Sequence, residues 1–87
     1  MKMTDDVDVY ITKDLPLASA LLSLRQRLLH LKSEGNHFIF IFQNKRTCER
    51  LANAFLNREL TVDAKTYAES LRTLKNKIFS QKGKEEP

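Results

Sequence analysis

Two histidines and one cysteine are the side chains in this sequence best suited to metal binding or catalysis: His30, His37 and Cys48. A zinc site needs several such ligands at short, regular spacing. The two histidines lie near the two ends of a predicted hairpin, with no acidic or cysteine ligand at recognisable spacing. Cys48 falls on the apolar stripe of a predicted helix. We therefore expect ordinary polar positions on a sheet and no metal site.

Catalytic motifs do not emerge from the other reactive residues either. Serine and carboxylate side chains are present, but no nucleophile can be paired with a base from their spacing. The sequence contains no glycine-rich phosphate loop and no paired carboxylate motif. We expect a protein that is not an enzyme and that carries no cofactor.

Basic residues gather in the middle of the chain. Lys45 and Arg46 occupy the first turn of a helix predicted over residues 45–57, where the helix dipole disfavours each cation by about 0.3 kcal/mol or more. Free N–H groups and two cations at such a helix end suit a phosphate, and Arg50 lies one turn further on. An ordinary solvated helix face is the alternative. Residues that would widen the basic surface, if the predicted hairpin brings them round, are Arg25, Arg27 and Lys32.

The most apolar segment is HFIFIFQ, residues 37–43, which has five consecutive apolar residues. A half-buried strand alternates apolar and polar residues, so two apolar faces predict a central strand. One set, phenylalanine or isoleucine, enters the core, and the other is expected to meet a second copy or a partner. The alternative is that a helix or the N-terminal segment folds back over it. The candidate interface residues are Phe38, Ile39, Phe40, Ile41 and Phe42.

Length and composition indicate one small globular domain. The chain has 87 residues, 41% hydrophobic and 30% charged, which is ordinary for a folded protein. No apolar run approaches the roughly 20 residues of a membrane span, and the N-terminus is too acidic for a signal peptide. The single cysteine excludes an internal disulfide framework, which favours a cytoplasmic location. The net charge of +4 allows weak attraction to polyanions.

The first half of the chain allows two interpretations. VDVYIT, residues 7–12, alternates and predicts a strand that buries its valines and isoleucine. A helix capped by Asp14 then follows. On periodicity it runs from about residue 15 to 31. The alternative ends it near Arg25, places a strand at residues 27–32 and forms a hairpin turn over residues 33–36, which gives HFIFIFQ a neighbour.

The second half of the chain is simpler. The predicted helix at 45–57 is followed by a possible edge strand at 59–62 and by a helix that begins after Asp63 and ends near residue 79. The predicted fold class is α+β, a small antiparallel sheet of three or four strands with helices on one face, in the order β-α-β-β-α-(β)-α. The expected boundaries are a flexible N-terminus at 1–6, a single domain at 7–79 and a frayed tail at 80–87.

With these elements placed, the chain resembles a family of short prokaryotic domains of unknown function. The resemblance is carried by VYITKDLPLASALLSL, FIFIFQ and FLNRELTVDAKTYAESLRTLKNKIF, which cover most of residues 8–80. It implies a glycine where this chain has Arg25, followed by a strand, which favours the hairpin. It also implies a glycine in place of Arg58, so that either Asn57 supplies a positive φ or Arg58 adopts it under strain. The resemblance implies no activity.

A partial likeness concerns GNHFIFIFQ, which with the following helix and NRELTV is similar to the third strand and second helix of the RNA-recognition motif. In that motif, aromatic residues at alternate positions stack on bases, and Phe38, Phe40 and Phe42 have this alternation. The first strand, however, offers only Tyr10, and the glycine spacing of the motif is absent.

These observations predict a small, non-enzymatic and dimeric accessory protein. It would bind DNA or RNA through backbone phosphates, using the basic residues above, while the sheet builds the homodimer. The alternative is a protein-interaction or regulatory module with no nucleic-acid role, in which the basic face only keeps the protein in solution.

Overall fold

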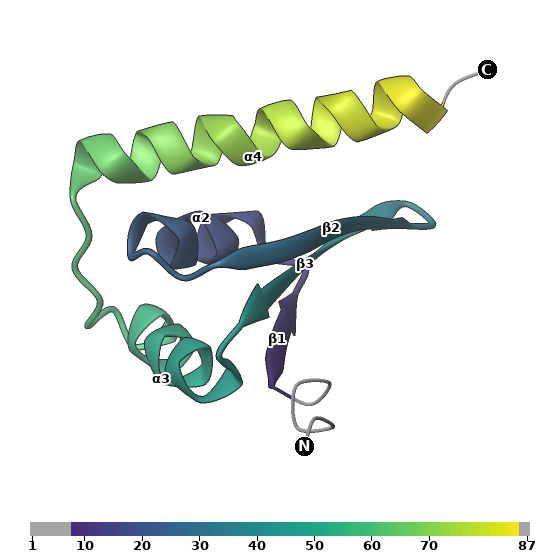
Figure 1. The fold of residues 1–87 in the computed structure, drawn as a ribbon. Helices are drawn as coiled ribbons and strands as arrows, with labels where there is room; N and C mark the ends of the chain where they lie inside the picture. The colour runs from purple at the N-terminus through teal and green to yellow at the C-terminus, as the bar shows by residue number, and fades with distance from the viewer. Residues whose placement is uncertain (1–7, 86–87) are drawn as a thin grey trace.

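Three helices cover one face of a three-stranded antiparallel sheet (Figure 1). The computed structural model describes residues 8–85, and the fold class is α+β, as the sequence predicted. The strand order is β1-β3-β2, so the predicted central strand is confirmed. The elements are β1 (Val9–Thr12), α2 (Leu15–Ser23), β2 (Leu28–Glu34), β3 (His37–Gln43), α3 (Lys45–Leu56) and α4 (Ala64–Glu85).

Several predicted boundaries are changed by the structure. The optional strand at 59–62 does not form, since this segment carries no strand pairing. The last helix runs to Glu85, so residues 80–85 are helical where a frayed tail was predicted. The segment at 1–6, predicted to be flexible, lies outside the described residues.

Strand β2 decides between the two interpretations of the first half of the chain. It pairs with β3 through a two-residue turn at Gly35 and Asn36, and Gly35 has φ 63°. A positive φ in a two-residue hairpin turn is adopted most easily by glycine. The helix before it, α2, ends at Ser23. The hairpin is therefore confirmed, and the long helix to residue 31 is wrong.

Phenylalanines of β3, and not its isoleucines, enter the core. Phe40 and Phe42 are buried, with Phe42 0% exposed, and they pack with residues of all three helices: Leu17, Ala18 and Leu21 of α2, Cys48 and Ala52 of α3, and Leu74 of α4. Ile39 and Ile41 point to the opposite face, where they are half-buried. This settles which of the two sets closes the domain.

The first strand faces the other way from the predicted orientation. Tyr10 lies opposite Phe42 and packs against the core, whereas Ile11 lies opposite Ile41 and is 57% exposed. In an antiparallel pair, residues directly opposite each other share a face. The register with β3 therefore decides the orientation, and the apolar alternation within β1 alone does not reveal it.

Helix α2 lies between α4 and the sheet (Figure 1) and is covered on more than one side. Ala18, Ser19 and Leu21 are each 0% exposed. Small residues allow two helices to approach closely, and the Ser19 hydroxyl donates to the Leu15 carbonyl at 2.9 Å, so it is not left unpaired. Helix α2 is therefore the centre of the helical layer.

Both α2 and α3 end in the same way, on an arginine with a left-handed backbone. Arg25 has φ 68° and Arg58 has φ 61°. After α2, Gln26 N–H donates to Leu21 O and Arg25 N–H to Leu22 O, each at 3.0 Å, which is the Schellman pattern. The equivalent bonds follow α3, from Glu59 N–H to Ala54 O at 2.8 Å and from Arg58 N–H to Phe55 O at 3.1 Å. Asn57 keeps φ −87°, so Arg58 carries the strain.

Replacing Arg58 with glycine should stabilise the protein. The left-handed conformation costs an L-residue about 1–2 kcal/mol, which glycine would avoid. Glycine also makes the unfolded chain more flexible, which offsets part of this gain, so we expect the free energy of unfolding to rise by about 0.5–1 kcal/mol. Urea unfolding measures it. Asn57→Gly is the matched control, because φ there is already negative, and it should give no gain. A lower stability for Arg58→Gly would contradict this account of the helix end.

Candidate nucleic-acid interface

The connection between α2 and β2 lies beside the start of α3. Gln43 N–H, at the end of β3, donates to the Arg27 carbonyl at 2.9 Å. A shallow hollow of about 360 Å³ forms at this junction, and its lining includes Arg25, Arg27 and Asn44. Arg25 and Arg27 therefore lie next to the residue that caps α3. These residues are far apart in the sequence, and the pairing of β2 with β3 brings them together.

The first turn of α3 is capped by side chains of this chain. Asn44 adopts φ 69° and its Oδ1 accepts from Thr47 N–H at 3.3 Å. Asp8 Oδ1 accepts from Lys45 N–H at 3.2 Å, and the Asp8 carbonyl accepts from Asn44 N–H at 3.1 Å. Two of the N–H groups predicted to be free for a phosphate are thus occupied. A phosphate at this helix end would therefore contact side chains. The role of Asp8 had no local sequence signal, because Asp8 lies 37 residues before Lys45.

The remaining predicted cations lie on the exposed side of α3. Arg46 and Arg50 are one turn apart and lie opposite the buried residues Cys48 and Ala52. Glu49 follows Lys45 by one turn and, with Asp8, is the acidic contribution to this surface. We call the five exposed cations the basic ridge. They are Arg25, Arg27, Lys45, Arg46 and Arg50.

Lys32 does not belong to the basic ridge. It lies on β2 opposite Ile39, on the sheet face that no helix covers. Five residues of strand at about 3.3 Å each place it roughly 16 Å from Arg27. The prediction that the hairpin brings Lys32 round to the other cations is therefore wrong.

The sheet face turned away from the helices is apolar at its centre. Ile11 and Leu29 are 57% and 36% exposed, and Ile39 and Ile41 are half-buried. Val9 shares this face, and with Leu29 it lines a small hollow at the end of β1. We call these five residues the open sheet face. An exposed apolar surface shared by three strands is typical of an interaction site.

The phenylalanines are not available to stack on bases. Phe40 and Phe42 are in the core, and Phe38 is half-buried on the same side of β3. The platform suggested by the likeness to the RNA-recognition motif is therefore on the wrong side of the sheet. The same burial removes Phe40 and Phe42 from the predicted interface residues, and it leaves Ile39 and Ile41.

The titratable groups near the ridge are not poised for nucleophilic chemistry. Burial raises the pKa of the Cys48 thiol, and the Asp8 carboxylate raises it further. Its Sγ lies 3.5 Å from the Gln43 carbonyl, as a weak donor. Burial also raises the pKa of the Tyr10 hydroxyl. Cys48 therefore remains a thiol at neutral pH and packs as a small apolar residue.

Within residues 8–85, no three side chains of histidine, cysteine, aspartate or glutamate are grouped so that they could hold a metal ion. None of the helices there combines the length and the apolar character needed to cross a membrane.

A family model described as "Domain of unknown function (DUF5659)" matches residues 7–80. No curated protein and no solved structure matches the chain.

Proposed function

The chain belongs to the DUF5659 family, a domain of unknown function, and we propose that it is a small accessory protein that binds nucleic acid as a dimer. The observation that carries this proposal is the meeting of Arg25 and Arg27 with the first turn of α3. Cations of the α2–β2 connection and cations at the start of α3 therefore lie near one another. The proposed location, the cytoplasm, rests on the single free cysteine, Cys48.

The chemistry of the ridge suits phosphates better than bases. Four of its five cations are arginines, and a guanidinium donates two parallel hydrogen bonds to a phosphate. Contacts of this kind position a protein on the nucleic-acid backbone without reading its sequence. We therefore expect weak sequence preference and strong salt dependence.

The open sheet face supplies the dimer in this proposal. Two copies related by a two-fold axis would pack these faces against each other, which would bury the exposed isoleucines of both copies. The complex would then carry two basic ridges. Doubling the number of phosphate contacts strengthens binding without any new chemistry. The histidines His30 and His37 lie on β2 and β3 without a further assigned role.

A salt titration with charge-reversed variants tests the nucleic-acid proposal. A fluorescent duplex and a single strand are titrated with protein at low and at physiological salt, and binding should weaken steeply as salt rises. Lys45→Glu with Arg46→Glu should weaken binding at least about ten-fold and flatten the salt dependence, because two contacts are lost.

Arg72→Glu with Lys75→Glu is the matched control. Both residues are exposed on α4, outside the ridge, and the double variant has the same net charge. It should bind more tightly than the ridge variant. No binding even at low salt, or equal loss in both variants, would reject the proposal and favour a protein-interaction module whose basic face only keeps it in solution.

A further inference from the structure

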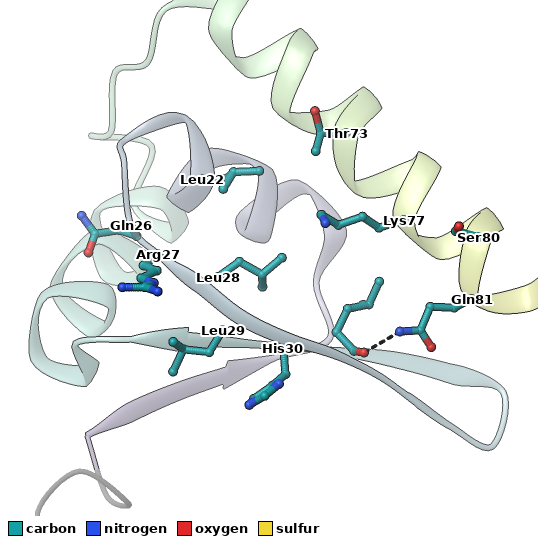
Figure 2. Close-up of a pocket in the computed structure, with 11 residues that line it drawn as sticks. Leu22, Gln26, Arg27, Leu28, Leu29, His30, Thr73, Lys77, Ser80 and Gln81 are labelled. Carbon is teal, nitrogen blue, oxygen red and sulfur yellow. Dashed lines mark hydrogen bonds between the residues drawn. The ribbon is translucent and has the colours of Figure 1, made fainter. Parts of the chain in front are cut away.

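A second hollow lies away from the basic ridge, between β2, the end of α2 and α4 (Figure 2). It is an open groove of about 720 Å³. Its apolar lining includes Leu22 of α2 and Leu28 and Leu31 of β2, and Lys77 extends into it from α4. The groove thus combines an apolar wall with one open side.

The outer edge of β2 borders this groove. Because the strand order is β1-β3-β2, β2 pairs on one side only with the strands in residues 8–85. Gln81 Nε2 of α4 donates to the Leu31 carbonyl at 2.8 Å, as the dashed line in Figure 2 marks. The Leu31 carbonyl therefore points away from β3. A side-chain amide occupies the position at which the N–H group of an added strand would donate.

The charge of the groove has one sign. Arg27 and Lys77 line it, and none of the lining residues in the described part of the chain is an aspartate or glutamate. Arg27 is shared with the basic ridge, whereas Lys77 and Gln81 are not. Lys77 and the leucines lie on the same, helix-covered side of β2, so the groove favours a ligand that presents both apolar residues and carboxylates to that side. Every second residue of an extended chain faces one side, so apolar and acidic residues that take turns at these positions would do so.

We propose that this groove binds an extended, acidic segment of a partner protein, which adds to the outer edge of β2 as a further strand. On the side of the segment that faces the helices, apolar side chains contact the leucines, and carboxylates two residues away contact Lys77. The N–H group of the segment replaces the Gln81 amide on the Leu31 carbonyl, so Gln81 holds the edge closed until the segment arrives.

The test uses the full chain and a fluorescein-labelled peptide with a repeating Val-Ser-Glu-Ser sequence, which in an extended strand places valine and glutamate in turn along one face. Anisotropy should show saturable binding, and amide NMR shifts should concentrate at Leu29 to Leu31. Lys77→Glu should weaken binding about ten-fold. Gln81→Ala, checked for folding by circular dichroism, should bind several-fold more tightly, because the Leu31 carbonyl is already free. Arg72→Glu, on the same helix but outside the groove, should leave the affinity unchanged.

Two control peptides separate strand addition from simple charge attraction. Replacing glutamate by lysine should abolish binding. Methylation of alternate peptide nitrogens keeps the charge but removes the main-chain donors, and it should also abolish binding. Equal affinity of the methylated peptide, or no binding of the original peptide, would overturn the proposal.

The basic ridge provides an independent comparison. Lys45→Glu with Arg46→Glu should not change peptide affinity, although it should weaken nucleic-acid binding, so the two proposals fail separately. If those substitutions weaken peptide binding as much as Lys77→Glu does, the peptide binds to the ridge, and the groove proposal is rejected. Amide NMR shifts at Leu31 that change with protein concentration in the absence of peptide would show that a second copy of the chain binds the β2 edge. That result would also reject the groove proposal.

Discussion

Phe42→Ala should lower the free energy of unfolding by about 3–5 kcal/mol, the usual cost of removing a buried aromatic ring. Phe42 is 0% exposed and lies between Tyr10 of β1 and Leu28 of β2 in the register of the sheet. Neighbouring residues can only partly collapse into the space that the ring leaves. For a domain of this size, that loss is comparable with the total stability.

The adjacent residue on the same strand is the matched control. Ile41 points to the open sheet face and is half-buried, so Ile41→Ala should cost under about 2 kcal/mol. Urea unfolding at low temperature measures both variants. Phe42→Leu keeps most of the volume and supplies a folded variant if Phe42→Ala does not fold. Equal losses at the two positions would contradict the assignment of the phenylalanine face to the core.

Ile11→Lys should convert the proposed dimer to a monomer with little loss of stability. Ile11 is 57% exposed on the open sheet face, on the edge strand β1, so a lysine there remains solvated in the monomer. In a face-to-face dimer, two such lysines would be brought together and desolvated, which costs several kcal/mol. Sedimentation velocity should show the mass fall by half.

Leu56→Lys is the control for the dimer prediction. Leu56 is 71% exposed at the end of α3 and is not part of the sheet, so its variant should remain dimeric. A wild-type monomer at all concentrations, or a dimer in both variants, would reject the open sheet face as the dimer interface. A monomeric Ile11→Lys should also show a shallower salt dependence of nucleic-acid binding, because one ridge remains per complex.

Much of the fold could be predicted from local sequence. The apolar HFIFIFQ segment indicated the central strand, and Asp14 indicated where α2 begins. These signals lie within a few residues of the structure that they predict. The helical periodicity of residues 15–31 was misleading. A register irregularity between Leu28 and His30 lets Leu28 and Leu31 face the same side of the strand although they are three residues apart, which is also the spacing of one helix face.

The features that the sequence did not reveal depend on distant contacts. Tyr10 faces the core because it pairs with Phe42, and Asp8 caps α3 because β1 begins beside the start of that helix. Lys32 is nearer to Lys45 along the chain than Arg25 is, yet of the two only Arg25 lines the hollow beside the start of α3. Local patterns identified the charged residues but not the surface on which they gather.

The central position of HFIFIFQ also has a consequence for the order of folding. The hairpin of β2 and β3 closes through a two-residue turn, whereas β1 and α4 must dock from far along the chain. Local contacts form faster than distant ones, so the hairpin exists before its partners cover it. During that interval both faces of the most apolar segment are open to solvent. Refolding at high protein concentration therefore competes with aggregation through this strand.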